Sequence, residues 1–348
     1  MRENRTSGSM RGCWGSRTVG LVRHRQTKGA ETDRPGLPAG GQCSTLPHYI
    51  TDERKSMGIP ESQLQAWSNQ GATVGSANTH HSIRAALNAH RWPAGMNYDP
   101  YLQGSYANAT NIRANSDVDL VVETSAVFYS NLSEDEKRAR GLSAGSFSWA
   151  DFRNQVLSAL KNYYGAAIVR PGDKSIKVAA GSTRLPADVV PCVEYQEYQD
   201  GRLYGVGMTF WAQSDNRQVI NFPKLHIENG AAKNSASRTR GWYKPAVRMF
   251  KNGRETIIGN SPALRRRYPS YFVECLLYNA SDRCYGGSYC DTFVAVVNEL
   301  SQKFDSEDHT KFICQNERRW LFDSSSVQWN RVDAQNFVAD LVRLWNEW

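Results

Sequence analysis

Two aspartates separated by a single residue, Asp117 and Asp119, lie in the β-branched run DVDLVVE at 117–123. Side chains alternate across a strand, so both carboxylates project from one face and Val118 projects from the other. Two carboxylates on one face repel, and one of them would protonate unless a cation lay between them. Mg²⁺ prefers hard oxygen ligands and leaves room for phosphate oxygens. The pair therefore predicts a metal site for phosphoryl transfer, where two ions about 3.5–4 Å apart can clamp the attacking and leaving oxygens.

Two other features of the sequence are suited to the same reaction, phosphoryl transfer. Gly104 and Ser105 precede the aspartate pair, and a tight turn there would present backbone N–H groups and a hydroxyl to a triphosphate. Asp188 lies in the apolar run PADVVPCV, where an acidic side chain is costly unless it is paired or bound to metal. Glu194 shares the face of Asp188 by strand parity and is the alternative third acid, although it lies farther out. Together these residues predict metal-dependent phosphoryl transfer.

Four segments, taken together, resemble one protein family. Residues 104–122, GSYANATNIRANSDVDLVV, resemble the signature of the bacterial cyclic-oligonucleotide synthases. These are the CD-NTases, relatives of animal cyclic GMP-AMP synthase and of the oligoadenylate synthetases. Residues 59–67, 222–230 and 243–251 are also similar to that family. The resemblance covers essentially all of 57–348.

The resemblance implies an α/β fold in which a polymerase-β-like nucleotidyltransferase lobe with a mixed sheet is joined to a C-terminal helical lobe. The active site would lie in the cleft between the lobes. Asp117 and Asp119 match the family's metal ligands for Mg²⁺ or Mn²⁺, and Asp188 matches its third acid, near the attacking hydroxyl. A 3′- or 2′-hydroxyl of one nucleoside triphosphate would attack the α-phosphate of another and release pyrophosphate. A second transfer would close a cyclic di- or trinucleotide.

Other positions match the family one by one. Ser270 and Tyr271 resemble its phosphate-binding serine and base-stacking aromatic, although a helix N-cap and a core tyrosine would give the same residues. Lys244 and Arg248 match the basic position that meets the triphosphate, and their i, i+4 spacing puts both on one helix face. A solvated basic face is the competing interpretation.

Asn221 falls where some relatives read the Watson–Crick edge of a base. An amide offers a donor and an acceptor, as uracil recognition requires. The resemblance therefore suggests a pyrimidine-containing product, such as cyclic UMP-UMP or UMP-AMP. The histidines His80, His81 and His226 have no partners at metal-ligand spacing, so packing or surface roles are predicted for them. Residues 265–267, three arginines, are interpreted as a solvated turn, with a phosphate or nucleic-acid contact as the alternative.

The elements that must position these residues follow from periodicity. Apolar residues at helical spacing predict a helix at 76–90, and Ser148 with Asp151 forms a capping-box pattern at the start of 148–164. Strands are predicted at 117–123, 175–179, 187–194 and 204–211. Helices are predicted at 243–251, 270–279, 291–304 and 333–348. We therefore expect a nucleotidyltransferase lobe with an N-terminal helix over 57–220 and a mostly helical lobe over 221–348.

The net charge of +8 is unevenly distributed. Residues 1–56 hold ten Lys and Arg against five Asp and Glu, a net of +5, which leaves +3 for the remaining 292 residues. A small positive balance suits nucleoside triphosphates and does not indicate a long nucleic-acid footprint. We therefore expect no nucleic-acid activator, such as double-stranded DNA, to be required.

The first 56 residues are rich in Gly, Ser, Thr, Arg and Pro and show no periodicity, which predicts a disordered basic extension. Met57 begins a segment that reads like a protein start. The upstream residues are therefore interpreted as a misannotated start, with a basic tail that binds RNA or an acidic partner as the alternative.

No stretch approaches the roughly 20 apolar residues of a membrane span, and the N-terminus lacks the apolar core of a secretory signal. The seven cysteines form no CxxC pair, so reduced thiols are favoured over a disulfide or a zinc site. We expect a cytoplasmic monomer without a membrane partner.

Three functions compete. The first is synthesis of a cyclic nucleotide that acts as a second messenger in antiphage defence and is sensed by a separately encoded effector, as the resemblance implies. The second is a nucleotidyltransferase that makes linear oligonucleotides or modifies a small acceptor. The third is a binding module without turnover, which the presence of all three acids disfavours.

Overall fold

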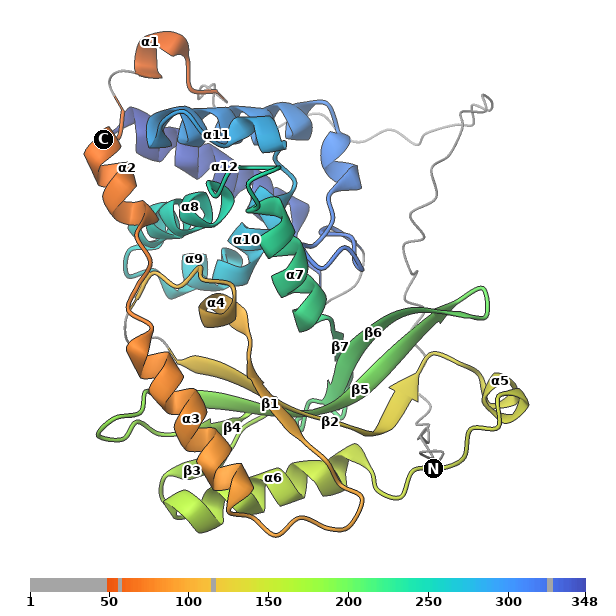
Figure 1. Cartoon of the computed structure of the whole chain (residues 1–348). Coiled ribbons are helices and arrows are strands. Elements are labelled where there is room, and N and C mark those ends of the chain that lie inside the picture. The colour runs from red at the N-terminus through yellow and green to blue at the C-terminus, as the bar shows by residue number, and fades with distance from the viewer. Residues whose placement is uncertain (1–48, 56–57, 114–116, 324–327) are drawn as a thin grey trace.

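The computed structural model describes residues 49–55, 58–113, 117–323 and 328–348 (Figure 1). Residues 1–48 of the predicted extension at 1–56, and the start at Met57, lie outside the described residues. Residues 49–55, which we assigned to the disordered extension, are ordered. Ile50 is buried, and its backbone N–H and C=O bond the side chain of Asn298, both at 2.9 Å. Ile50 and its neighbours therefore pack against the helix that contains Asn298.

The nucleotidyltransferase lobe is built on a mixed seven-stranded sheet with the order β1-β2-β5-β4-β3, and β6 and β7 continue from the far part of β5. The strands are β1 Asp99–Leu102, β2 Val118–Ser130, β3 Val169–Pro171, β4 Ile176–Val178, β5 Ala187–Gln199, β6 Arg202–Trp211 and β7 Gln218–Asn221. The parallel pair β2 and β5 forms the centre, and the other pairings are antiparallel.

Two helices, α3 (Val74–Asn88) and α6 (Trp149–Tyr164), lie along one face of this sheet (Figure 1). Their apolar residues pack with those of β2, β4 and β5 into one core, which includes Ile83, Phe152 and Val118. The predicted capping box of α6 is present: Ser148 accepts from the Asp151 backbone, and the Asp151 side chain accepts from the Ser148 backbone. One face of the sheet is thus closed, and the other faces the second lobe.

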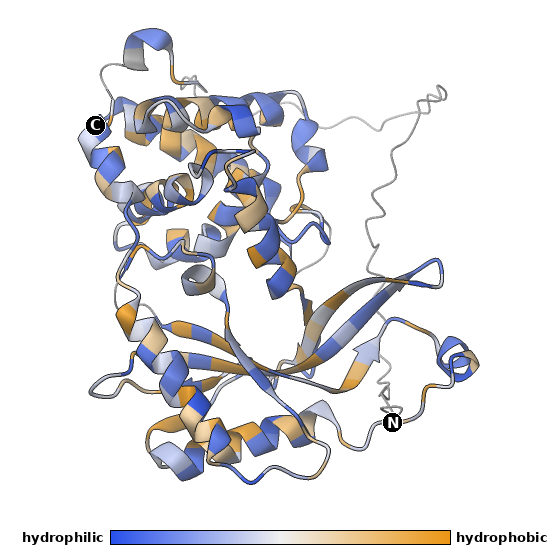
Figure 2. Ribbon diagram, in the orientation of Figure 1, coloured by the Kyte–Doolittle hydropathy of each residue, from blue (hydrophilic) through white to orange (hydrophobic). Residues whose placement is uncertain are grey.

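The second lobe is helical and has its own core. It contains α7 (Pro223–Lys233), α8 (Tyr243–Ile258), α9 (Pro262–Arg267), α10 (Ser270–Tyr278), α11 (Tyr289–Asp305) and α12 (Arg331–Asn346). In Figure 2 the hydrophobic colour gathers on the helix faces inside the bundle of α8, α10, α11 and α12.

Two N-terminal helices lie with the helical lobe, α1 (Asp52–Lys55) and α2 (Glu61–Ser68) (Figure 1). Ile59 and Leu64 are buried in the helical core, and α2 packs against α8. Residues 61–68 fall within the range 57–220 that we assigned to the first lobe, but they pack with the second, because the apolar face of α2 is completed by α8.

The predicted fold class is confirmed, and so are the predicted strands and helices, with shifts at their ends. Elements that periodicity missed are the short strands β1, β3 and β7, the helix α7, and short helices such as α4 (Gly104–Ala107) and α5 (Glu134–Ala139). Strands of three or four residues are too short for an alternating pattern to emerge.

Candidate active site

The strand register brings the two halves of the predicted acidic triad together. Asp119 in β2 is the direct partner of Asp188 in the parallel strand β5. Asp117 is exposed and immediately precedes β2. Directly paired residues point to the same face of a sheet. Asp119 and Asp188 therefore share the face that is not covered by α3 and α6.

Proximity of these carboxylates has a measurable electrostatic consequence. Partial burial, followed by the negative charges of Asp188 and Asp117, raises the pKa of Asp119 to about 6. Lys177 and Lys251 act in the opposite direction, but their effect is smaller. The side chain is therefore short of positive charge, which is the condition we predicted from the spacing of the two aspartates.

Gly104 lies directly against Asp119. Its φ is +66°, and a Cβ atom added there would lie 2.5 Å from Asp119 Oδ2. The backbone N–H of Gln103 donates to the Asp119 carbonyl at 3.0 Å. Only glycine fits this position, for both conformational and steric reasons. Gly104 and Ser105 begin the short helix α4, so the predicted tight turn is a single helical turn next to the acidic pair.

Asp188 is held from its other side by β4. Its Oδ1 accepts from Ser175 Oγ at 3.0 Å and from Lys177 Nζ at 3.1 Å. The lysine is the direct partner of Asp188 across β5 and β4. Our sequence analysis missed both donors, although they lie in the predicted strand 175–179, because no spacing rule links them to an acid in the next strand.

Glu194, the alternative third acid, lies elsewhere. It pairs with Phe128, beyond the register shift in β2, and its Oε1 accepts from Gln196 Nε2 at 2.7 Å. Asp188 is therefore the third acid that the fold places opposite Asp119.

The loop after Gly104 is tied to the helical lobe by a buried cluster centred on Glu274. The carboxylate accepts from Thr110 Oγ1 at 2.8 Å and contacts the ammonium group of Lys251 closely. Lys251 also donates to the Thr110 carbonyl at 3.2 Å, and His226 Nε2 lies 3.2 Å from Glu274 Oε2. Although burial opposes ionisation, the attraction of Lys251 and His226 lowers the pKa of Glu274 to about 2.

The two basic residues predicted at the triphosphate differ in their contacts. Arg248 donates from Nε to the Ser68 carbonyl at 2.5 Å and from Nη1 to the Ala109 carbonyl at 2.6 Å. This guanidinium therefore fastens α2 and the Gly104 loop to α8. Lys244 is half-buried, and burial lowers the pKa of its ammonium group. Its side chain is the more available of the two for an anionic ligand.

The residues predicted at the base and the second phosphate position lie on α10 and β7. Ser270 is exposed and is the first residue of α10, whose N-cap is Pro269, so the N-cap alternative is wrong. Tyr271 is 37% exposed, and its ring lies 4.8 Å from His226 and 5.5 Å from Trp329, centroid to centroid. Burial raises the pKa of its hydroxyl well above the usual range, so the core-tyrosine alternative holds for the hydroxyl end of the side chain and not for the exposed part of the ring.

Asn221 ends β7, where it pairs with Met208, and its side chain is half-buried. Its Oδ1 accepts the backbone N–H of Phe222 at 2.9 Å. One end of the amide is thus already bonded within the chain, and Nδ2 remains as a donor. A carbonyl oxygen accepts two hydrogen bonds, so Oδ1 retains one acceptor position beside the Nδ2 donor, and the two-point reading of a base stays a prediction.

The three acidic side chains are of the ligand type that binds a divalent cation. Asp117, Asp119 and Asp188 supply only carboxylate oxygens, the ligand type that Mg²⁺ and Mn²⁺ prefer. The raised pKa of Asp119 marks the place where positive charge is lacking. Among the described residues, no three acidic, histidine or cysteine side chains already converge on one point. An ion would therefore have to draw the three carboxylates together.

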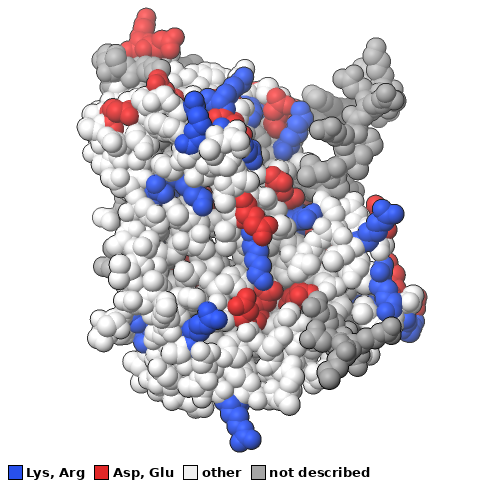
Figure 3. All heavy atoms as spheres, in the orientation of Figure 1, with Lys and Arg blue, Asp and Glu red and all other residues white. Residues whose placement is uncertain are grey.

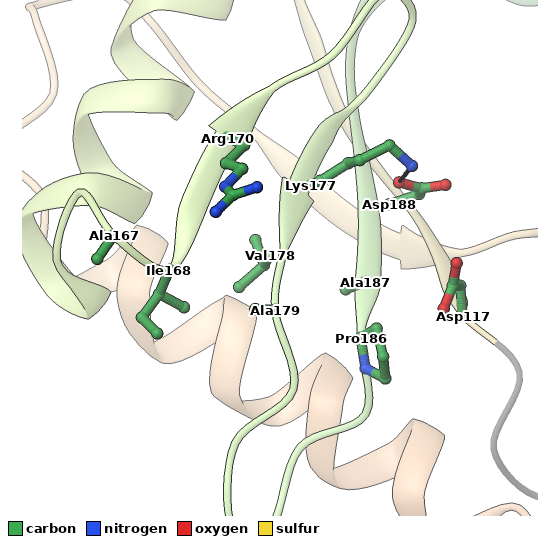
Figure 4. Close-up of a pocket in the computed structure, with 10 residues that line it drawn as sticks. All are labelled: Asp117, Ala167, Ile168, Arg170, Lys177, Val178, Ala179, Pro186, Ala187 and Asp188. Atoms are coloured by element: carbon green, nitrogen blue, oxygen red, sulfur yellow. Dashed lines mark hydrogen bonds and ion pairs between the residues drawn. The ribbon is translucent and has the colours of Figure 1, made fainter.

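A pocket of about 340 Å³ opens beside the acids, at the edge formed by β3, β4 and β5 (Figure 4). Asp117 and Asp188 line one side of it, and Lys177 and Arg170 come from the two outer strands. The remaining lining is formed by small and aliphatic side chains: Ala167, Ile168, Val178, Ala179, Pro186 and Ala187. Charge is thus confined to the rim nearest the acids and the outer strands.

Charge is scattered over the surface. On the face drawn in Figure 3, Lys and Arg side chains lie singly or in small groups among Asp and Glu and form no continuous basic stripe. Within the described segments, no helix combines the length and apolar character needed to cross a bilayer. The described cysteines, at 192, 275, 284, 290 and 314, are unbridged.

Comparison with known proteins gives concordant matches. Residues 228–346 match the C-terminal helical domain of cGAS/DncV-like nucleotidyltransferases. The chain is 48% identical over 296 residues to a cyclic UMP-AMP synthase of Rhodothermus marinus, which covers 84% of this chain and 99% of that protein. It is 37% identical over 306 residues to the cyclic nucleotide synthase CdnE01 of Staphylococcus haemolyticus, and this match covers 84% of this chain and 100% of that protein.

A solved structure agrees with these matches. The structure of the Rhodothermus marinus CdnE c-UMP-AMP synthase with Apcpp and Upnpp superimposes with a TM-score of 0.77 at 47% identity. The match covers 83% of this chain and 97% of that one. The likeness therefore extends over both lobes.

Proposed function

Because the chain belongs to the cGAS/DncV-like nucleotidyltransferase (CD-NTase) family, we propose that it joins UTP and ATP into a cyclic dinucleotide. The chain is a nucleotidyltransferase that synthesises a cyclic nucleotide. The observation that carries the proposal is the pairing of Asp119 with Asp188 beside Gly104, in a chain 48% identical to a cyclic UMP-AMP synthase.

In the proposed reaction, Asp117, Asp119 and Asp188 hold Mg²⁺ or Mn²⁺, which supplies positive charge to the phosphates when bound. The hydroxyl oxygen of one nucleotide bonds to the α-phosphorus of the other. The bond from that phosphorus to the bridging oxygen breaks, and pyrophosphate leaves with the electron pair. Asp188 takes the hydroxyl proton and passes it to solvent. A second transfer of the same kind closes the ring.

Positioning supplies much of the rate enhancement in such a site. We propose that the Gly104 and Ser105 backbone, Lys244 and Ser270 bind the triphosphate of the donor nucleotide. Arg248 contributes by holding the Gly104 loop through the Ala109 carbonyl. In the proposed complex Tyr271 stacks on a base and Asn221 donates from Nδ2 to its edge. Uracil O4 is an acceptor that such a donor suits.

The cellular part of the proposal rests on the family resemblance. The product would be a second messenger in antiphage defence of the CBASS type, sensed by a separately encoded effector. The enzyme would act as a cytoplasmic monomer and without a nucleic-acid activator. The net charge of only +3 over residues 57–348 supports the last point. A large rate increase on adding double-stranded DNA would contradict it.

Mass spectrometry of the products tests the proposal. The protein is incubated with all four nucleoside triphosphates and Mg²⁺ or Mn²⁺, with Asp117→Ala/Asp119→Ala as the blank. We expect a phosphatase-resistant product with one uridine and one adenosine. A product that phosphatase shortens would indicate linear oligonucleotides. Absence of pyrophosphate release with every mixture and both metals would leave a binding module.

Base choice is tested separately at Asn221. Asn221→Ala removes the free Nδ2 donor, and we expect the UTP preference over CTP to fall by about tenfold, because one charge-neutral hydrogen bond to a base carries about that much discrimination. Total pyrophosphate release with ATP alone serves as the internal reference. An unchanged UTP preference would remove Asn221 from the proposed base site.

A further inference from the structure

Four charged side chains form one row across the sheet. Asp119 pairs with Asp188, Asp188 pairs with Lys177, and Lys177 pairs with Arg170, each as direct partners in adjacent strands. Direct partners project to the same face. The face that carries the catalytic acids therefore changes from two negative charges to two positive charges as it passes from β2 to β3.

The two cations are not equivalent. Lys177 is committed to Asp188, with Nζ 3.1 Å from Oδ1. Arg170 is exposed, and within the described residues no hydrogen bond or ion pair engages its guanidinium. Figure 4 shows Lys177 reaching to Asp188 while Arg170 stands apart at the rim of the pocket. The ion pair with Asp188 explains the position of Lys177, whereas no contact among the described residues explains the position of Arg170.

The lining of the pocket indicates which partner suits Arg170. Asp117 and Asp188 stand on one side and Arg170 with Lys177 on the other, over small apolar residues. The guanidinium of Arg170 presents a planar set of donors suited to phosphate oxygens. An anion held there would lie on the far side of Asp188 from Gly104, because the strand order places β4 and β3 beyond β5.

We propose that Arg170, with Lys177 beside it, forms a phosphate subsite for the acceptor nucleotide, the one whose hydroxyl attacks. This inference rests on the proposed function, in which the donor triphosphate lies on the Gly104 side and the attacking hydroxyl lies near Asp188. The acceptor's own 5′-phosphates then extend over β4 and β3. The phosphates of the donor nucleotide and those of the acceptor nucleotide therefore lie on opposite sides of Asp188.

The chemistry of the two transfers makes the subsite selective for the first. In the first transfer the acceptor is a nucleoside triphosphate, with several negative charges on its 5′ side. In ring closure the attacking nucleotide is joined to the other through a phosphodiester, with one negative charge. Both steps form an oxygen–phosphorus bond and release pyrophosphate. Arg170 therefore contributes more to the first transfer than to ring closure.

Varying the number of acceptor phosphates tests the subsite. AMP, ADP and ATP are offered as acceptors with UTP as donor, since AMP cannot release pyrophosphate and so acts only as acceptor. For Arg170→Ala we expect KM for ATP as acceptor to rise about tenfold, the loss expected for one charge-assisted contact. We expect KM for AMP to change much less, and Arg170→Lys to retain most of the ATP preference.

Two controls make the result specific. Arg266→Ala removes an exposed arginine of α9 in the other lobe and should leave every KM unchanged. A chemically prepared linear dinucleotide with a 5′-triphosphate should be cyclised by Arg170→Ala at close to the wild-type rate. For Arg170→Ala, an equal rise in KM for AMP and for ATP would overturn the proposal. Equal loss of rate in the first transfer and in ring closure would overturn it too, and so would an unchanged KM for ATP. If the wild type makes only linear product, ring closure fails, while the AMP and ATP comparison still decides the subsite.

Discussion

Two groups of charged side chains, one around Asp119 and one around Glu274, lie near each other between the lobes. The pKa of the central carboxylate is raised in the first and lowered in the second. At Asp119 partial burial and two neighbouring carboxylates raise the pKa to about 6. At Glu274 burial is more complete, yet Lys251 and His226 lower the pKa to about 2. Burial disfavours ionisation in both places, so the difference comes from the neighbours. In the first cluster Lys177 bonds Asp188 and only partly offsets the charges around Asp119, whereas Lys251 and His226 contact Glu274 directly.

The difference separates the site that we propose for a ligand from a cluster that holds the lobes together. Glu274 has its partners within the chain: Thr110, Lys251 and His226. Asp119 has a carboxylate as its partner across the strands, and in the proposed function the metal ion supplies the missing positive charge. A cluster that holds its own counter-charges stabilises the protein. One that does not is costly to stability and useful for chemistry.

Replacing Asp119 should give the largest effect. Asp119→Asn removes one carboxylate oxygen charge without changing size, and we expect product formation to fall by at least about a thousandfold, because the charge acts in the transition state. The melting temperature should be unchanged or higher, since one source of repulsion is gone. Asp200→Asn, at an exposed turn, is the matched control and should retain full activity. A lowered melting temperature for Asp119→Asn would place Asp119 in the structural class.

Glu274→Gln should reverse that pattern. At pH 7 we expect a loss of about 3 kcal/mol in the free energy of unfolding, because Lys251 loses its buried counter-charge. The pKa of Glu274 is lower in the folded state, about 2 against 4.5, so its stabilisation is present above pH 4.5 and is lost as the pH falls towards 2. Urea unfolding should therefore show a smaller difference in the free energy of unfolding between wild type and variant at pH 3 than at pH 7. A gap independent of pH would contradict this assignment.

Gly104→Ala tests whether the active-site cluster depends on close backbone approach. The added methyl group would lie 2.5 Å from Asp119 Oδ2, so we expect about a hundredfold loss of activity from displacement of that carboxylate. Gly95→Ala is the matched control: its φ is +80°, but no atom lies within 4 Å of the added Cβ. Both variants should lose about 1 kcal/mol of stability from the left-handed backbone. Only the first should lose activity, and equal activity in the two would contradict the steric argument.

Strand parity is a local rule, so part of the candidate site could be proposed from the sequence. It predicts Asp117 and Asp119 on one face, and the structure places Asp119 in β2 and Asp117 immediately before that strand. The apolar run around Asp188 predicts a buried strand that contains an acid, which β5 confirms. The direct pairing of Asp119 with Asp188 was not predictable, since register between distant strands depends on tertiary packing. Ser175 and Lys177 were missed for the same reason: their relation to Asp188 exists only across the strands.

The interlobe cluster was not predictable at all. Thr110, Glu274 and Lys251 are far apart in the sequence, and Glu274 occupies the middle of an apolar helix, α10. A charged residue in such a helix indicates that some partner exists but not which one. His226 was assigned to packing for want of a partner at ligand spacing, and its contact with Glu274 comes from another helix. Periodicity finds elements, whereas contacts between elements require the fold.

One hydroxyl in each cluster allows the smallest and most direct comparison. Ser175 donates to Asp188 at 3.0 Å, and Thr110 donates to Glu274 at 2.8 Å. Each bond to a carboxylate contributes on the order of 1–2 kcal/mol. For Ser175→Ala we expect the rate of product formation to fall about fivefold and the melting temperature to change little, because Asp188 is partly exposed and water can replace the lost bond.

For Thr110→Val, which keeps the shape of the side chain, we expect about 1–2 kcal/mol lower stability and a smaller change in rate. Pyrophosphate release and urea unfolding on the same preparations measure both quantities. Thr110 Oγ1 also accepts from Lys251 Nζ at 3.1 Å, and Glu274 is more deeply buried than Asp188, so the comparison depends on which quantity changes, rate or stability, and not on the size of the change. If both variants lost rate and stability in the same proportion, the two clusters would act as one unit coupled through Lys251, which contacts Glu274 and also lowers the pKa of Asp119.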